Sequence, residues 1–239
     1  MTLALSLALV AYLLLASPVL GKRAYDRLAA ARAADPGVYR RMFGLWCAEL
    51  WLLAATALVI VVLSSDLGPA DLGLTLTEPL GDTLGTVSGF LIVGAVSTYI
   101  LPRFMKGRPV PGQGNVVHLM PHTRTEHWYA AGLSVTAGIT EEIVYRGLLI
   151  AVGMSVFGLD QKTAAAAALA VFAIGHLYQG WHGMVMVTLA GLGLTLLYLR
   201  TGSLLLPILL HILIDLRGLV LLAPKPKPQP QPQPVGLAA

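Results

Sequence analysis

Long apolar segments constrain the fold of this chain more than any other feature of its sequence. Of the 239 residues, 56% are hydrophobic and only 12% carry charge, and the mean hydropathy is +0.74. A helix of about 20 apolar residues crosses the hydrocarbon core of a bilayer, and several segments reach that length. Lipid offers no hydrogen-bond partner to an open backbone, and the alternating pattern of a membrane β-barrel is missing. The sequence therefore predicts an all-α, polytopic transmembrane helix bundle, which makes the chain a multi-pass integral membrane protein.

The apolar segments predict seven membrane-spanning helices in one membrane domain, or eight if Gly147 breaks the fourth. The first helix has no basic start and runs directly into Lys22 and Arg23, so we expect a retained helix and not a cleaved signal peptide. The expected ranges are 2–20, 42–63, 84–101, 127–156, 161–178, 182–199 and 203–222.

Basic residues collect in the connections 22–41 and 102–126, whereas the charged residues of the connection 64–83 are all acidic. An excess of Lys and Arg favours the cytoplasmic side, so we expect these two loops inside and the N-terminus outside. The isoelectric point near 9.3 indicates contact with an anionic lipid bilayer and no nucleic-acid partner, because the basic residues lie mostly at helix ends. The two loops carry Lys22, Arg23, Arg27, Arg32, Arg40 and Arg41, and Arg103, Lys106, Arg108 and Arg124.

Two adjacent acidic residues, Glu141 and Glu142, lie with Arg146 inside an apolar helix. Ionisable groups within a membrane are rare and usually functional. On a helix, Glu142 and Arg146 are four residues apart and share a face, whereas Glu141 and Arg146 are about 140° apart. We therefore expect Arg146 to neutralise Glu142, and Glu141 to point elsewhere and remain available for chemistry.

Two further polar clusters follow on separate helices. His176 ends an alanine-rich segment, and alone it fits a packing residue better than a catalyst. His211 and Asp215 lie four residues apart on one helical face, where an Asp that orients a His is as good an explanation as catalysis. Together with Glu141, these residues can activate water and stabilise an oxyanion, as a hydrolase requires. Helix counting puts Glu141 and His176 about 10 Å apart in depth, a gap that helix tilt or extension must close.

The three clusters resemble the CPBP intramembrane proteases, the family of CAAX proteases and bacteriocin-processing enzymes also called Abi. That family carries EExxxR, then FxxxH, then HxxxN or HxxxD on separate transmembrane helices. This chain carries the three patterns in the same order and with the same internal spacing, within residues 127–222. They read Glu141-Glu142 and Arg146, Phe172 and His176, and His211 and Asp215.

The resemblance implies an intramembrane endopeptidase that hydrolyses protein or peptide substrates at the membrane, which we expect to be a bacterial cytoplasmic membrane. It further implies that Glu141 and His176 activate the attacking water, and that His211 with Asp215 binds the oxyanion. Structural support of the site would come from Glu142, Arg146 and Phe172.

The chain then divides into three parts. Residues 1–126 hold three transmembrane helices with basic cytoplasmic loops, and residues 127–222 form the CPBP-like catalytic core. In residues 223–239, Pro alternates with Lys or Gln, which predicts a disordered, extended cytoplasmic tail. Cys47 is the only cysteine, so intrachain disulfides and cysteine-rich metal sites are excluded.

Two features of the site stay open at the level of sequence. An Asn at position 215 could donate a hydrogen bond to an oxyanion, whereas an ionised Asp can only accept one. Asp215 is therefore either protonated, an orienting partner of His211, or a metal ligand. Two His and one carboxylate match a catalytic zinc shell, but a metal-free glutamate site uses the same residues. If a divalent metal such as Zn²⁺ is bound, its expected ligands are Glu141, His176 and His211.

Other functions fit less well. The GxSG segment of a rhomboid-like protease and the GxGD segment of a presenilin-like protease are missing. An ion- or proton-coupled transporter, with the polar residues as a relay, is the main alternative function, and a non-catalytic membrane adaptor is another.

Glu49 is a further charged residue within an apolar segment, the second predicted helix. We favour a side chain that snorkels to the membrane surface over one that joins a polar cavity.

Overall fold

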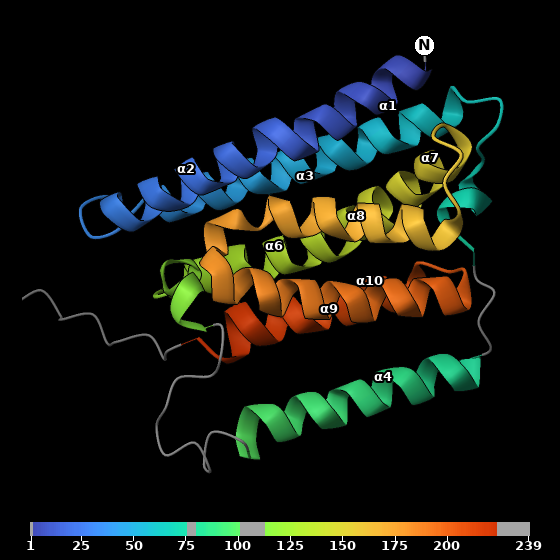
Figure 1. The fold of residues 1–239 in the computed structure, drawn as a ribbon. Helices are drawn as coiled ribbons and strands as arrows, with labels where there is room; N and C mark the ends of the chain where they lie inside the picture. Colours follow the sequence, from blue (N-terminus) through green and yellow to red (C-terminus); the bar gives the residue numbers. More distant parts are fainter. Residues whose placement is uncertain (1, 76–79, 101–112, 224–239) are drawn as a thin grey trace, which may run out of the picture.

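The computed structural model describes residues 2–75, 80–100 and 113–223, and all regular elements in these residues are helical (Figure 1). They form seven rods and three short 3₁₀ turns. Four of the rods contain a π-helical segment that continues an α-helix without a break. The rods are α1 (Thr2–Ala11) with η1 (Tyr12–Ala16) and α2 (Ser17–Ala31); α3 (Val38–Val62); α4 (Leu80–Ala95) with η3 (Val96–Ile100); α6 (Arg124–Glu141) with η5 (Glu142–Leu149) and α7 (Ile150–Ser155); α8 (Gln161–Gly175); α9 (Gly180–Thr201); and α10 (Leu205–Asp215) with η7 (Leu216–Leu221). The turns are η2 (Pro69–Leu72), η4 (Gln113–Leu119) and η6 (Leu177–Gln179).

The seven predicted helices are present, but the first ends later than predicted. It continues past residue 20 to Ala31, because its last turns bury Leu28 on one side while Lys22 pairs with Asp26 at 2.6 Å on the exposed side. No break occurs at Gly147, so the fourth predicted helix stays one continuous rod and is not divided into two. A Cβ at Gly147 would lie 3.2 Å from the carbonyl oxygen of Leu72, so this glycine instead lets η2 approach the rod.

Three helices are long and apolar enough to cross a membrane by length and composition: Thr2–Ala31, Val38–Val62 and Leu177–Thr201. Their outward faces carry large apolar side chains such as Leu15, Leu52 and Leu189, each more than half exposed. A water-soluble surface does not tolerate so many exposed leucines, whereas lipid does. The chain is therefore an integral membrane protein.

The connections fall at two ends of the bundle (Figure 1). At one end, the guanidinium of Arg32 donates to the carbonyl oxygens of His118 and Met120, both at 2.7 Å, so the described parts of the two basic connections lie together. At the other end, the backbone N–H of Leu204 donates to Gly73 at 2.9 Å. Several predicted features lie outside the described residues, namely the proline-rich tail, Glu78, Arg103, Lys106 and Arg108.

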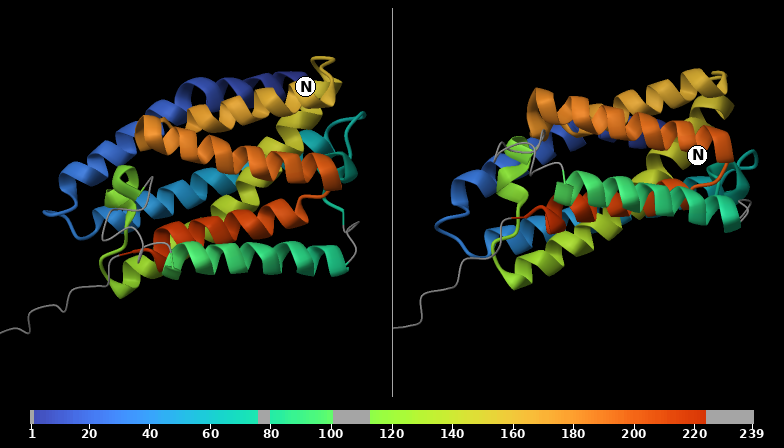
Figure 2. Two further views of the ribbon diagram at one scale, coloured as in Figure 1. Left: turned by 60° about the horizontal axis from the view of Figure 1, so that its bottom comes forward. Right: turned by 90° about the horizontal axis from the view of Figure 1, so that it is seen from below.

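The rod formed by α6, η5 and α7 runs obliquely through the bundle and packs against α3, α8 and α10 (Figure 2). The approach of α6 to α10 depends on Gly138, since a Cβ there would lie 2.8 Å from the backbone nitrogen of Ile212. α4 is peripheral and contacts α10 (Figure 2). The predicted polar clusters thus come from neighbouring rods in the interior.

Candidate active site

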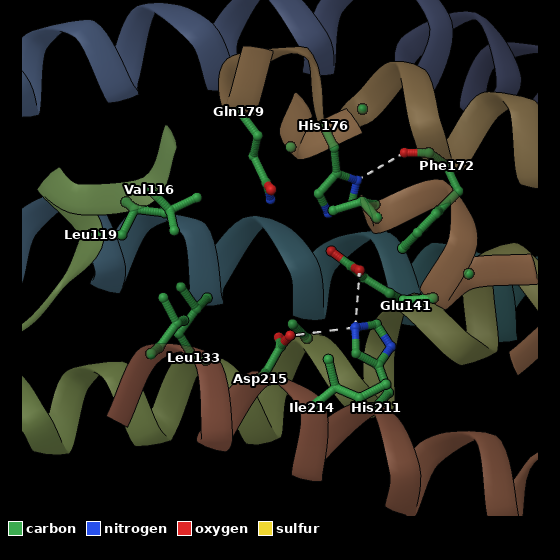
Figure 3. A pocket seen from close by; sticks show the side chains of 18 of the residues that line it. Val116, Leu119, Leu133, Glu141, Phe172, His176, Gln179, His211, Ile214 and Asp215 are labelled. Atoms are coloured by element: carbon green, nitrogen blue, oxygen red, sulfur yellow. Dashed lines mark hydrogen bonds and ion pairs between the residues drawn. The ribbon is translucent and has the colours of Figure 1, made fainter. Parts of the chain in front are cut away.

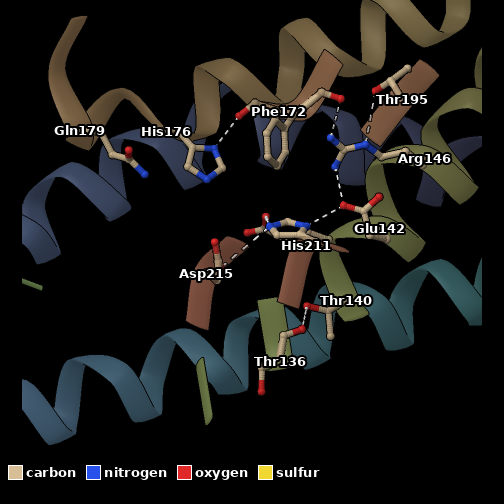
Figure 4. Close-up of polar contacts among 12 residues, drawn as sticks. Thr136, Thr140, Glu142, Arg146, Phe172, His176, Gln179, Thr195, His211 and Asp215 are labelled. Atoms are coloured by element: carbon tan, nitrogen blue, oxygen red, sulfur yellow. Dashed lines mark hydrogen bonds and ion pairs between the residues drawn. The ribbon is translucent and has the colours of Figure 1, made fainter. Parts of the chain in front are cut away.

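The carboxylate of Glu142 is fully buried and pairs with Arg146 one turn along the same rod. Nη1 of Arg146 lies 2.9 Å from Oε1 of Glu142, as the four-residue spacing predicts (Figure 4). Its guanidinium also donates to the carbonyl oxygen of Gly191 at 3.1 Å and to Thr195 at 3.4 Å. It lies 4.5 Å from the ring centre of Phe172. Arg146 therefore ties η5 to both α8 and α9.

His211 joins this pair from α10. Its Nδ1 lies 2.6 Å from Oε1 of Glu142, the same oxygen that accepts from Arg146. A carboxylate paired with a guanidinium is ionised and can only accept hydrogen bonds, so Nδ1 carries a hydrogen. Nε2 then faces the other two carboxylates, 3.8 Å from Glu141 and 3.9 Å from Asp215 (Figure 3). Glu142 thus fixes the orientation of the His211 ring.

His176 is held in a similar way at the end of α8. Its Nδ1 lies 2.8 Å from the carbonyl oxygen of Phe172, which can only accept, so Nδ1 donates and Nε2 is left for the cavity. The ring centre of Phe172 lies 4.6 Å from that of His176 and 6.3 Å from that of His211. The buried Phe172 therefore contacts both imidazoles as well as Arg146.

Glu141, His176, His211 and Asp215 line one cavity of about 360 Å³ (Figure 3). Helix counting predicted that Glu141 and His176 differ in depth by about 10 Å. In the structure both side chains nevertheless line the same cavity. All four residues predicted to be catalytic thus line one cavity.

The residues do not form a ready metal site. In residues 2–75, 80–100 and 113–223, no group of three His, Cys, Asp or Glu side chains is arranged to hold a metal ion. The predicted set of Glu141, His176 and His211 does not have this arrangement.

The cavity is also lined by polar residues that the sequence motifs did not identify as functional. The carboxylate of Glu49 accepts a hydrogen bond from Tyr12 at 2.8 Å and lines the cavity, so the predicted snorkelling to the membrane surface is wrong. Gln179 and Arg217 also line it, and Nε of Arg217 donates to Thr98 on η3 at 2.7 Å. Gln179 stands three residues after His176, and this proximity was the only sequence signal that could have drawn attention to it.

A second ion pair, largely buried, lies next to a segment that lines the cavity. Nη2 of Arg32 lies 2.9 Å from Oε2 of Glu126, and the same oxygen accepts from the backbone N–H of His122 at 2.6 Å. The neighbouring segment supplies Leu119 and Met120 to the cavity wall. Burial lowers the pKa of His122 below its usual value, and Arg32 adds to the shift. The Arg32–Glu126 pair therefore holds one wall of the cavity in place.

Comparison with known proteins places the site within a family. Residues 123–217 match the family model described as Type II CAAX prenyl endopeptidase Rce1-like, a segment that includes every predicted site residue. No curated protein and no solved structure matches the chain. Residues 123–217 are therefore similar to the Rce1-like CAAX proteases, which is consistent with the family that the three motifs resemble.

Proposed function

We propose that this protein cleaves peptide bonds of membrane-associated proteins or peptides with a water molecule activated by Glu141 and His176. The observation that carries the proposal is the convergence of these two residues with His211 and Asp215 on one cavity inside a membrane protein. A buried acid beside two oriented imidazoles is the arrangement expected for general acid–base catalysis. We further propose that all seven rods cross the bilayer, with residues 127–222 as the catalytic core and the basic connections in the cytoplasm.

The proposed reaction begins when Glu141 accepts a proton from water and Nε2 of His176 accepts the hydrogen bond that orients the nascent hydroxide. The hydroxide oxygen forms a bond to the carbonyl carbon, and the carbonyl oxygen becomes an oxyanion. His211, when protonated on both nitrogens, donates from Nδ1 to Glu142 and from Nε2 to this oxyanion. The carbon–nitrogen bond then breaks, and the departing amine takes its proton from Glu141.

Asp215 and the ion pair have supporting roles in this proposal. Asp215 lies one turn after His211 and holds Nε2 toward the cavity. Glu142, fixed by Arg146, keeps the opposite nitrogen of His211 occupied. Glu142 keeps its contacts with Arg146 and His211 throughout the reaction, so this part of the site is organised before substrate enters.

The test compares wild type with Glu141→Gln and His176→Ala in proteoliposomes that contain a library of lipid-anchored peptides, with cleavage read by mass spectrometry. We expect cleavage by the wild type and none by either variant, while circular dichroism shows all three folded. Gln161→Ala, an exposed substitution at the start of α8, is the matched control and should cleave normally.

Three results would contradict the proposal. Full cleavage by both variants would remove Glu141 and His176 from the mechanism. A wild type that cleaves nothing but dissipates a proton gradient would favour a transporter, and one that does neither but captures a membrane partner would favour an adaptor.

A further inference from the structure

Three carboxylates line the cavity, beside donors that include Tyr145, Tyr178 and Arg217. Glu141, Glu49 and Asp215 contribute carboxylates to its lining. Nε2 of His176 is a bare acceptor in the neutral ring, because Nδ1 uses its hydrogen on Phe172. A tetrahedral oxyanion instead needs donors about 2.7–3.1 Å away. His211 supplies one donor when protonated, and the position that could hold an Asn amide is occupied by Asp215.

Gln179 brings an amide into the same cavity from the opposite side. Its side chain points from η6 into the cavity near His176, across from Asp215 (Figures 3 and 4). Nε2 lies 3.1 Å from the hydroxyl of Tyr178 and donates one hydrogen to it. A primary amide carries two hydrogens, so the second remains for a ligand.

The local backbone is built to hold this side chain. The N–H of Gln179 donates to the carbonyl oxygen of His176 at 2.9 Å, which fixes the turn between the two residues. Gly180 follows with φ of 67°, a conformation that favours glycine. A Cβ at Gly183 would lie 2.5 Å from Cβ and 3.1 Å from Oε1 of Gln179, so the missing side chain of Gly183 makes room for the amide. The placement of Gln179 thus follows from three separate features of the turn.

We propose that Gln179 is a catalytic residue that donates a hydrogen bond to the oxyanion, and so supplies the amide that Asp215 does not. This inference rests on the proposed endopeptidase function. Gln179 transfers no proton: its second amide hydrogen bonds to the carbonyl oxygen of the scissile peptide and the bond strengthens as that oxygen becomes negative. His211 approaches the oxyanion from α10 and Gln179 approaches it from η6, which places the scissile carbonyl between the two elements.

The test uses Gln179→Met, which keeps the size of the side chain and removes the amide. We expect kcat to fall by about 10²–10³, as for the loss of one oxyanion donor, with KM changed by less than about twofold. A phosphinic peptide that mimics the tetrahedral intermediate should bind more weakly by a similar factor. Binding of a substrate peptide, measured in the Glu141→Gln background, should stay unchanged. Gln161→Met, at an exposed position of α8, is the matched control.

A second readout separates a donor from a packing role. In an Asp215→Asn background, an amide stands at position 215, so Gln179→Met should cost much less than it does in the wild type. Gln179→Asn, which retains an amide, covers the case in which the methionine variant does not fold, and it should keep more activity than Gln179→Ala.

The outcomes distinguish this inference from the proposed function. If the wild type is active and Gln179→Met is equally active, only the role of Gln179 is overturned. The same holds if Gln179→Met changes KM and not kcat, or if its loss of activity is as large in the Asp215→Asn background as in the wild type. A wild type without peptidase activity, in the assay that compares it with Glu141→Gln, overturns both.

Discussion

Nδ1 of His211 and Oε1 of Glu142 lie 2.6 Å apart, and the same oxygen accepts a hydrogen bond from Arg146 at 2.9 Å. One buried carboxylate oxygen therefore joins α10 to η5, and Arg146 extends the contact to α9. Since a charge buried without its partner is costly, this network should be as important to the stability of the fold as to the site.

Arg146→Met tests the stabilising role of the ion pair. The substitution leaves Glu142 buried without its guanidinium, and breaking such a pair costs about 3–5 kcal/mol. We expect a large fall in the thermal unfolding temperature in detergent, measured by intrinsic fluorescence. Arg200→Met, an exposed arginine at the end of α9, should leave that temperature unchanged. Equal unfolding temperatures for the two variants would show that the pair does not stabilise the fold.

Arg32→Gln tests the ion pair between Arg32 and Glu126. Arg32 bonds to Glu126 and to two carbonyl oxygens of the neighbouring segment, and hydrogen bonds to charged groups are worth about 1.5–3 kcal/mol each. We expect amide hydrogen exchange in 116–123 to become faster by about tenfold or more, since that segment loses its main attachment. Lys22→Gln, which breaks the exposed pair with Asp26, should leave exchange there unchanged. Unaltered exchange in Arg32→Gln would mean that the wall is held by other contacts.

The parts of this site that lie within one helix were predictable, and the parts that join helices were not. The pairing of Glu142 with Arg146 follows from their four-residue spacing, which a helix places on one face. The contact between Glu142 and His211 spans 69 positions of sequence, and no periodicity reports it. The resemblance to the family motifs predicted that His211 belongs to the site, but it did not indicate which carboxylate His211 contacts.

Two residues show the physical limits of the sequence-based predictions. Glu49 looks like a charge near a membrane surface, and only the position of Tyr12 on the neighbouring rod makes it part of the cavity wall. Gln179 is uncharged and stands in a turn, where a polar residue needs no explanation. The bounds of the first helix were missed for a related reason, because its last turns alternate basic and apolar residues and resemble a loop.

Acidification should weaken the attachment of the cavity wall. Burial, Arg32 and His118 lower the pKa of His122, while Glu126 opposes them. A His with a lowered folded pKa binds fewer protons when folded than when unfolded, so stability is lost as pH falls below the ordinary pKa of about 6.5. The loss levels off once pH lies below the lowered folded value. Hydrogen exchange of 116–123 followed from pH 7.5 to 5, corrected for intrinsic rates, should rise in the wild type and much less in His122→Asn. A pH response retained in full by His122→Asn would assign it to another group.

Gly138→Ala should disable the site from outside the cavity. A Cβ at Gly138 would lie 2.5 Å from Cγ1 and 2.8 Å from the backbone nitrogen of Ile212, the residue after His211. Backbone cannot move aside as a flexible side chain can, so α10 must shift away from α6 and carry His211 with it. A displacement of about 1 Å can cost 10²-fold in rate, whereas overpacking costs about 1–3 kcal/mol in stability. We therefore expect a folded protein with kcat reduced by about 10²-fold.

Gly132→Ala is the matched control for this prediction, because it lies on the same helix and a Cβ there meets nothing within 4 Å. Alanine is a better helix former than glycine by about 0.5–1 kcal/mol, so this variant should be at least as stable as wild type and fully active. If Gly138→Ala cleaved peptides at the wild-type rate, the spacing between α6 and α10 would not control the geometry of His211. If both variants lost activity equally, the effect would arise from the change in helix propensity and not from the contact with Ile212.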